Sequence, residues 1–291
     1  MTLLSLLVVL VIEQVYPLLE HGAMGALRRH VVTLHARLVP GARSGGGVAW
    51  WLTVLGATGG AGLAYGLLHG LHPLFGFVFS VGALYFAFGY RDEIRSFSDI
   101  HLALSTGETE QARALLERWC GLSLEGASAD ELTRLAIEQA LVRAHRRLFG
   151  LIFWLVLLPG PSGAVLYRVA NMLVREGSYA ERAFAVLDWL PVRLTAVAYA
   201  VIGNFENAIY CWRTQSTLWP DGASGILISS GGGALGVRLG LPIHESGRVV
   251  ERPEMGTGDI ADVSHMHGAA KIAWRVLVLY LLLLALLQVA G

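Results

Sequence analysis

Long apolar runs separated by polar segments dominate the pattern of residues along this chain. Residues 48–68 and 73–90 hold no charged side chain, and a third run, residues 272–289, holds one. Their lengths match the about 17–25 residues that a helix needs to cross a bilayer. The pattern predicts an all-α integral membrane protein, a polytopic bundle of transmembrane helices with a helical cytoplasmic segment.

Charged side chains interrupt two further apolar runs. Glu13 falls inside residues 3–19, and Arg193 and Glu206 fall inside residues 189–212. A lone charge at the centre of a membrane helix costs about 2.5–3.5 kcal/mol on insertion scales. These side chains are therefore expected to have partners, either in structural ion pairs or around a polar cavity that holds a ligand.

The apolar run at residues 148–174 is broken in its middle by the sequence Pro-Gly-Pro-Ser-Gly at residues 159–163. Two prolines and two glycines do not continue a straight helix. Irregular backbone at membrane depth persists only where protein or water satisfies its polar groups. Two alternatives stay open: a short loop between two spans, or a re-entrant turn that lines a cavity.

Basic residues predict the orientation of the chain in the membrane. Arginines follow the first apolar run at residues 28–43, and Lys271 and Arg275 flank the start of the last run. Positive residues favour the cytoplasmic side. The first run lacks the basic start and the cleavage site of a signal peptide, which favours a retained span. We expect a multi-pass protein of a bacterial inner membrane with both termini periplasmic, and four or six crossings.

A polar segment with helical patterns lies between the apolar runs. Its second helix has a good start, because Ser128 or Asp130 can accept the free N–H groups of a first turn. We therefore expect three parts: residues 1–90 with three spans and a basic loop, residues 91–147 as the helical cytoplasmic segment, and residues 148–291 with the broken helix, a Gly-rich segment and the last span.

The composition supports the membrane interpretation and excludes one class of function. Hydrophobic residues make up 54% of the chain and charged residues 15%, against about 25% charged residues in a soluble domain. The net charge of zero argues against a protein dedicated to nucleic acid, so the bilayer is the expected partner. Cys120 and Cys211 form no C-x-x-C pair, and we interpret both as structural.

Two sequence motifs lack the local context that a binding site would need. Residues 231–236 match G-x-G-x-x-G, but the βαβ unit that a dinucleotide site needs is not predicted around them. His265-Met266-His267, with His244 and Asp262 nearby, makes a metal site conceivable. Alternate histidines face different ways on a helix, so a solvated loop is the preferred interpretation and no metal ligand is assigned.

Arg143, His145, Arg146 and Arg147 lie directly before an apolar run. Anionic lipid headgroups attract basic residues there by about 1 kcal/mol each. The cluster is therefore either a topology anchor or a clamp for phosphate or carboxylate, which arginine forks bind bidentately.

Three segments carry a resemblance to a known family. Residues 155–171, 187–196 and 233–240 resemble, in the same order, segments of the CobD/CbiB family of cobalamin biosynthesis, and the similarity covers most of the chain after about Asp99. Residues 1–14 and 186–208 also look like AmpE, a related inner-membrane protein tied to signalling for β-lactamase induction.

The CobD/CbiB resemblance implies an ATP-dependent enzyme that joins adenosylcobyric acid to an aminopropanol phosphate through an amide bond. The family carries the motif E-S-L-A-E-N-x-x-D-G. Glu138 matches its first acid, but Val142 and Arg143 stand where the second acid and the amide belong, and Arg146 and Arg147 replace the Asp-Gly. Losing acids while gaining arginines would weaken a divalent-metal site.

The resemblance and the charged positions together select candidate residues for a polar site near the cytoplasmic side. The candidate catalytic residues are Glu138, Asn171 and Asp188, and the candidate residues for a phosphate or other ligand are Arg143, Arg146, Arg147, Arg193 and Arg238. ATP with Mg²⁺, a corrinoid and a phosphorylated amine are implied if the synthase interpretation holds. The alternatives are an AmpE-like, non-catalytic sensor and, with less support, a transporter suggested by the broken helix.

Overall fold

The computed structural model describes residues 2–15, 21–38 and 46–290. It is 80% helical, which confirms the predicted all-α membrane fold. The α-helices are α1 (Thr2–Val15), α2 (His21–Leu38), α3 (Gly46–Leu71), α4 (Pro73–Phe88), α5 (Tyr90–Ser105), α6 (Thr109–Cys120), α7 (Ala129–Ala144), α8 (Gly150–Leu157), α9 (Ser162–Met172), α10 (Ser178–Ile202), α11 (Phe205–Gln215), α12 (Gly222–Leu235) and α13 (Val263–Ala290). A π-helical turn, η1 (His145–Phe149), joins α7 to α8, and a 3₁₀ turn, η2 (Ser216–Leu218), follows α11.

Four helical stretches in the described residues are long and apolar enough to cross a membrane: Gly46–Leu71, Pro73–Ser105, Ser178–Ile202 and Val263–Val289. The third starts earlier than the predicted run at residues 189–212, which breaks at Gly203 before α11 begins. The predicted first span, residues 3–19, is not among these four, since its described part, Leu3–Gln14, is a shorter apolar helix. The number of crossings stays a prediction. The positions of the termini stay a prediction.

By its internal contacts the chain clusters into two compact units. Unit 1 comprises Met1–Arg91, Arg146–Trp189 and Leu283–Gly291, and unit 2 comprises Asp92–His145 and Leu190–Leu282. The predicted division at residues 90 and 147 stays a prediction.

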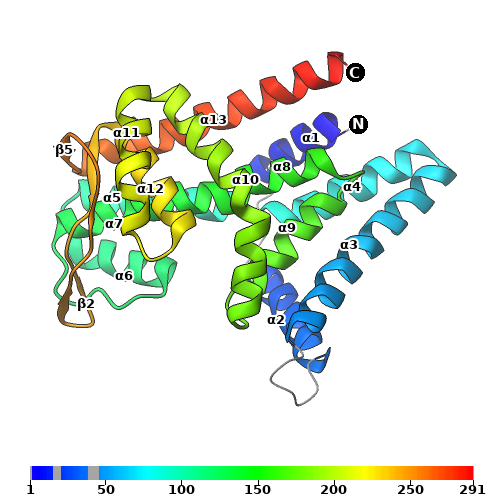
Figure 1. Cartoon of the computed structure of the whole chain (residues 1–291), viewed down its shortest axis with the longest axis horizontal. Helices are drawn as coiled ribbons and strands as arrows, with labels where there is room; N and C mark the ends of the chain where they lie inside the picture. Colours follow the sequence, from blue (N-terminus) through cyan, green and yellow to red (C-terminus); the bar gives the residue numbers. More distant parts are fainter. Residues whose placement is uncertain (1, 16–20, 39–45, 291) are drawn as a thin grey trace. The chain divides into compact units, whose positions relative to one another are not determined.

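Unit 1 contains a helical hairpin made by α8 and α9 (Figure 1). A Cβ added to Gly163 would lie 1.8 Å from the Trp154 carbonyl oxygen, and one added to Gly150 would lie 2.3 Å from the Tyr167 hydroxyl. The two helices therefore touch through their glycines. With 11 residues, α9 is about 17 Å long at 1.5 Å per residue, too short for a hydrocarbon core of about 30 Å. This length disfavours a loop between two full spans and favours the re-entrant turn.

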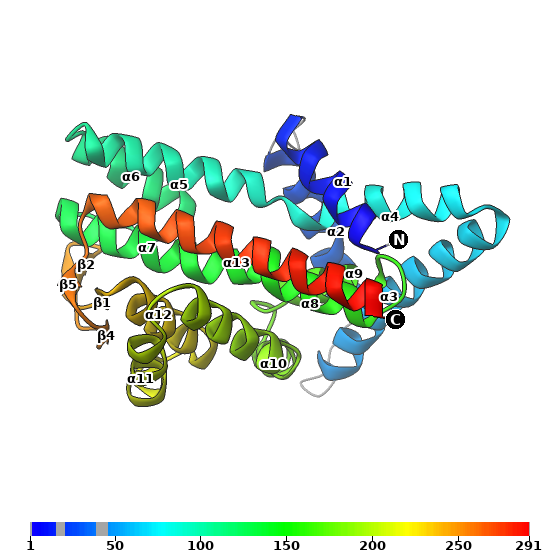
Figure 2. The same ribbon diagram turned by 90° about the horizontal axis from the view of Figure 1, so that it is seen from above.

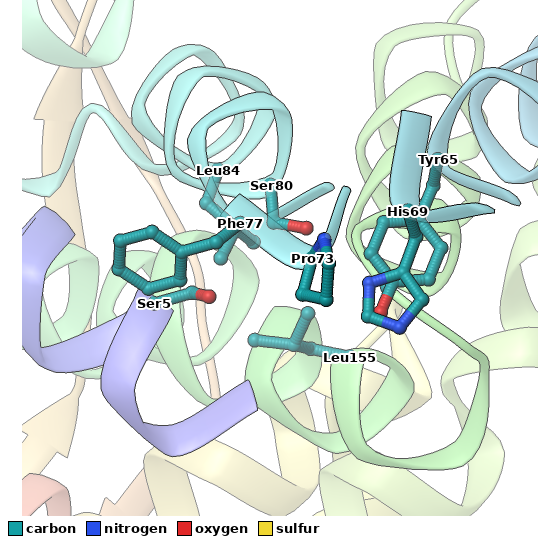
Figure 3. A pocket seen from close by; sticks show the side chains of 9 residues that line it. Ser5, Tyr65, His69, Pro73, Phe77, Ser80, Leu84 and Leu155 are labelled. Atoms are coloured by element: carbon teal, nitrogen blue, oxygen red, sulfur yellow. The ribbon is translucent and has the colours of Figure 1, made fainter. Parts of the chain in front are cut away.

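The turn of that hairpin packs on α3. Gly160 has a positive φ of 61°, and a Cβ there would lie 2.5 Å from the Tyr65 ring. Figure 3 shows the adjoining cavity, where Tyr65 stacks on His69 at 5.4 Å. Ser5, Ser80 and Leu155 are among the other residues that line it. Its volume is about 10 Å³, which suits one water molecule. The broken helix thus borders a water-sized cavity that is too small for a substrate.

Glu13 has the partner that its place in an apolar run requires. It is 5% exposed, and its carboxylate accepts the Arg91 backbone N–H at 3.1 Å. The Arg91 side chain donates to the Glu13 carbonyl at 2.8 Å and to the Gln14 carbonyl. Glu206, in contrast, is exposed in the first turn of α11.

Unit 2 holds a small β layer that the sequence patterns did not predict. Strands β1 (Val237–Gly240), β4 (Glu254–Gly256) and β5 (Asp259–Ile260) form a sheet of order β4-β1-β5, antiparallel between β1 and β4 and parallel between β1 and β5. A separate hairpin pairs β2 (Ile243–Glu245) with β3 (Arg248–Val250). Figure 2 shows β1 and β4 beside α12. The strands have two to four residues each, too few to produce a clear alternation.

The glycines of the G-x-G-x-x-G match are packing contacts. They lie in the last turns of α12 and lead into β1, the reverse of the strand-to-helix order of a dinucleotide site. A Cβ on Gly233 would lie 2.5 Å from the Asn207 carbonyl oxygen of α11, and one on Gly232 would lie 3.0 Å from Gly256 of β4. Gly236 ends the helix in the left-handed conformation at φ 72°. The glycines let α12 approach α11 and β4 closely.

The loop prediction for His265-Met266-His267 is wrong. These residues lie in the first turns of α13, where Asp262 accepts the N–H groups of Ser264 and His265 and also contacts His265 Nδ1 at 2.7 Å. An Asp at this position satisfies the free N–H groups of the first turn.

Candidate functional site

Glu138 is the centre of a buried polar cluster in unit 2. The helix that carries it begins as predicted, with Ser128 and Glu131 forming a capping box. Glu138 is 1% exposed, and its carboxylate accepts two hydrogen bonds from Arg252, at 2.9 and 3.2 Å, and a third from the Gly240 backbone N–H at 2.8 Å. Arg252 also lies over the Trp219 ring at 5.4 Å. This ion pair joins residues 114 positions apart in the sequence.

The backbone after β1 is held by two arginines. Arg252 donates to the carbonyls of Gly240 at 3.0 Å and Leu241 at 3.1 Å. Arg134 donates to the carbonyl of Pro242 at 3.0 Å. Leu241 itself has a positive φ of 61°, which is uncommon for a residue other than glycine and indicates local strain.

Burial and ion pairing shift the pKa of the Glu138 carboxyl in opposite directions. Burial raises the pKa of the Glu138 carboxyl, while Arg252, the Gly240 N–H and Arg134 oppose the rise. At Glu131 burial also raises the pKa, but hydrogen bonds from the Ser128 N–H and from His244 outweigh it, and the pKa is lowered. Glu138 is therefore the carboxyl of this cluster closest to an acid–base role.

Arg143, a candidate for ligand binding, lies within a network that joins α5, α6 and α7. Its guanidinium donates to Glu93 at 3.0 Å, to Gln139 at 3.3 Å and to the Trp119 carbonyl at 2.5 Å. It also lies 4.8 Å from the centre of the Trp119 ring, whose Nε1 donates to Glu93 at 2.6 Å. These contacts give Arg143 a structural role, and its role in ligand binding stays a prediction.

Replacing Arg143 with glutamine is expected to lower the free energy of unfolding by about 2 kcal/mol, because hydrogen bonds to a charged, largely buried carboxylate are lost. Equilibrium unfolding of the purified protein in detergent measures this change. Arg118→Gln, at an exposed position of the same unit, is the control and is expected to change stability by less than about 0.5 kcal/mol. Equal stability of both variants would contradict a structural role for Arg143.

Cys120, next to this network, has the properties of an unreactive thiol. Burial raises its pKa to about 12, against the opposing effect of Arg143. At pH 8 the thiolate fraction is on the order of a thousandfold below that of an ordinary cysteine.

In a Cys211→Ala background, alkylation of Cys120 at pH 8 is therefore expected to be on the order of a thousandfold slower in the folded protein than in denaturant. Mass spectrometry of the labelled protein measures both rates. Comparable rates would contradict the raised pKa and the burial of the Cys120 thiol.

The other unit-2 candidates, Arg238 and Arg193, are half-buried. Arg238 lies on β1, two residues before Gly240, and its Nη1 is 3.9 Å from Glu254. Arg193 lies on α10.

Unit 1 holds a second buried polar group. Asp188 of α10 is 1% exposed and accepts a hydrogen bond from the Tyr167 hydroxyl at 2.9 Å. Arg146 and Arg168 act electrostatically on the same phenol. Tyr167 is fully buried and Arg168 is 5% exposed. Asp188 and Arg146, two predicted site residues, therefore both interact with Tyr167.

The structure thus distributes the predicted site residues over both units. Glu138, Arg143, Arg193 and Arg238 belong to unit 2, and Asn171, Asp188, Arg146 and Arg147 belong to unit 1. Sequence reasoning missed Arg134 and Arg252, which contact the Glu138 cluster, and Tyr167 and Arg168, which accompany Asp188. Tyr167 and Arg168 fall inside a segment that resembles the family, so that resemblance was an available signal. Arg252 had none.

No group of three or more His, Cys, Asp or Glu side chains with metal-binding geometry occurs in the described residues. Glu138, the acid that matches the family motif, has both carboxylate oxygens bound by Arg252, one of which also accepts the Gly240 N–H. Mg²⁺ needs free carboxylate oxygens. The observed donor set therefore does not fit a magnesium ion at Glu138.

Comparisons with known proteins agree with the resemblance. The family described as CobD/Cbib protein matches residues 21–273. A curated relative named Cobalamin biosynthesis protein CobD, from Stutzerimonas stutzeri, is 32% identical over 94% of this chain and 91% of its own length. A CobD from Chromobacterium violaceum is 34% identical over 64% of this chain and 63% of its own, and Cobalamin biosynthesis protein CbiB from Salmonella arizonae is 23% identical over 89% and 88%. No solved structure matches.

Proposed function

This chain belongs to the CobD/CbiB family of cobalamin biosynthesis, and from that premise we propose that it joins adenosylcobyric acid to an aminopropanol phosphate. The carboxyl carbon of the corrinoid bonds to the amine nitrogen, and the carboxyl oxygen leaves as phosphate on a phosphoryl group that ATP transfers as it becomes ADP. The ammonium group loses two of its three protons and keeps one on the amide nitrogen. The corrinoid, the phosphorylated amine and ATP are the proposed small-molecule partners.

The observation that carries this proposal is the contact between Glu138 and Gly240. Two segments that resemble the family, about 100 residues apart in sequence, meet at one buried carboxylate. Glu138 is proposed to act as a positioning residue, because its carboxylate holds both the Gly240 backbone and the Arg252 guanidinium. Arg252 is proposed to orient this carboxylate through its two hydrogen bonds.

The substitutions in the acidic motif are compatible with this assignment. Arg143 stands where the family motif has an amide side chain, and it donates hydrogen bonds to Glu93 and to the Trp119 carbonyl. Glu138 is bound by Arg252 instead. Since the residues around Glu138 do not fit Mg²⁺, no step is assigned to a protein-bound metal there.

The proposed setting is the inner membrane of a bacterium, with the N- and C-termini on the periplasmic side. Multiple apolar helices and cobalamin-named relatives support a multi-pass membrane protein of this pathway. Neither the matched family nor the relatives described above support the AmpE-like alternative.

The test is complementation of a bacterial strain that lacks the synthase. Wild type is expected to restore growth that depends on cobalamin made from adenosylcobyric acid. Glu138→Gln keeps the size of the side chain and removes the charge, and it is expected to abolish rescue, whereas Glu254→Gln, at an exposed site of the same unit, is expected to retain it. Immunoblots of membrane fractions establish equal expression.

Binding of adenosylcobyric acid and of ATP with magnesium to purified protein in nanodiscs gives a second measurement. Saturable binding by wild type that is lost in Glu138→Ala or Arg193→Ala supports the proposed site. No rescue by a well-expressed and folded wild type would refute the enzymatic function.

A further inference from the structure

Arg134 has two neighbouring N–H donors, Nε and Nη2, and only Nη2 has an acceptor among the described residues. It lies on α7 one turn before Glu138 and is 8% exposed. Its Nη2 donates to the Pro242 carbonyl at 3.0 Å, while the neighbouring Nε is buried and has no hydrogen-bond partner among the residues that the structure describes. The two N–H groups on this edge of a guanidinium form a fork that matches two oxygens of a phosphate or carboxylate. The Pro242 carbonyl oxygen accepts a hydrogen bond from only one of these two N–H groups.

Two carboxylates on which Arg134 acts electrostatically, those of Glu131 and Glu138, are bound by other residues. The charge of Arg134 opposes the rise in the pKa of Glu138 and helps to lower the pKa of Glu131, yet no ion pair among the described residues includes Arg134. Glu138 is held by Arg252, and Glu131 is held by the Ser128 N–H at 2.7 Å and by His244 at 3.0 Å. A buried guanidinium without a direct anionic partner is costly. An anion from outside the chain would remove that cost.

The backbone beside Arg134 adds an independent observation. Leu241 is strained at φ 61°, and arginines hold the carbonyls on both sides of it, Gly240 through Arg252 and Pro242 through Arg134. Strained residues that persist under such surrounding contacts are concentrated at ligand and active sites.

We propose that Arg134 is the recognition residue of a phosphate-binding site. Two phosphate oxygens accept hydrogen bonds from its Nε and Nη2, and the phosphate displaces the Pro242 carbonyl oxygen from Nη2. The proposal that the site binds phosphate is argued from the geometry of Arg134 alone. Its assignment to the phosphate of the amine substrate rests on the proposed function. A soluble phosphorylated compound and a lipid headgroup both supply this chemistry.

Inorganic phosphate is the probe for the first experiment. The full-length protein in detergent is titrated with phosphate at constant ionic strength, with chloride as the balancing anion, and the midpoint of thermal unfolding is followed. Wild type is expected to show saturable stabilisation. Arg134→Gln and Arg134→Lys are expected to raise the apparent Kd about tenfold or more, because neither retains the fork. Arg118→Gln is expected to bind as wild type does.

Arg134→Lys keeps the positive charge and the long stem, so it supplies the test if Arg134→Gln does not fold. Phosphate binding of the lysine variant at the wild-type Kd overturns the proposal. Wild type without saturable stabilisation by phosphate at tens of millimolar overturns it as well.

The second experiment distinguishes the two sources of phosphate. The same proteins are placed in nanodiscs of phosphatidylcholine or phosphatidylglycerol and titrated with inorganic phosphate. Binding that depends on Arg134 in both lipids assigns the site to a soluble ligand. Loss of this binding in phosphatidylglycerol alone, with a higher unfolding midpoint that Arg134→Lys removes, assigns it to the headgroup.

The inference and the proposed function fail separately. Phosphate binding that depends on Arg134 in a wild-type protein without complementing activity supports the site and refutes the synthase. Complementation by wild type together with unchanged phosphate binding in Arg134→Lys refutes the site and leaves the synthase intact.

Discussion

Glu138→Ala is expected to lower the free energy of unfolding by about 3–5 kcal/mol, because it leaves the Arg252 guanidinium largely buried without its carboxylate. The Arg252 side chain is 15% exposed and that of Glu138 is 2% exposed, so water compensates little of the loss. The Gly240 N–H loses its acceptor at the same time. Equilibrium unfolding in detergent, followed by circular dichroism, measures the change.

Two controls separate a broken ion pair from a general effect of mutation. Glu254→Ala removes a carboxylate that is 48% exposed and 3.9 Å from Arg238, and it is expected to cost less than about 1 kcal/mol. The double variant Glu138→Ala with Arg252→Met removes both charges and is expected to recover part of the stability lost in the single variant. A single variant as stable as Glu254→Ala would show that the pair is not buried in the folded protein.

Gly163→Ala is expected to destabilise unit 1 by about 3 kcal/mol, because the added methyl group forces α8 and α9 apart. Its carbon would lie 1.8 Å from the Trp154 carbonyl oxygen, which is backbone and has no alternative rotamer. Thermal unfolding in detergent measures the stability. Accessibility of the hairpin turn to a thiol reagent, with a cysteine introduced at Ser162, reports its opening.

Gly59→Ala is the matched control for this prediction. Gly59 lies in α3, and a Cβ there meets nothing within 4 Å. Alanine is therefore expected to leave stability unchanged or to raise it by up to about 1 kcal/mol through helix propensity. If both alanine variants had wild-type stability and a closed turn, the close packing of α8 on α9 would be refuted.

The sequence was informative wherever the environment acts on consecutive residues. Lipid demands long apolar helices, so residues 48–68 and 73–90 were recognisable from their composition alone. The start of α7 was also predictable, because Ser128 and Glu131 satisfy free N–H groups a few positions away. Glu13 was correctly expected to have a partner, although Arg91 was not identified as that partner.

Sequence reasoning was weaker for short or irregular structure. Strands of two to four residues in the segment 237–260 produce no clear period, and the π-helical turn at His145–Phe149 has no recognised sequence signal. The segment around His265 was assigned to a loop because the N-terminal cap that Asp262 provides for α13 was not recognised.

Sequence alone determined that this is a membrane protein of helices, that its family segments occur in order and that Glu138 is the motif acid it keeps. Tertiary structure decided what Glu138 contacts. Arg252 lies 114 residues away, and Arg134 reaches a carbonyl 108 residues away. A pairing over such a distance depends on how α7 packs against β1, and no spacing within the chain encodes it.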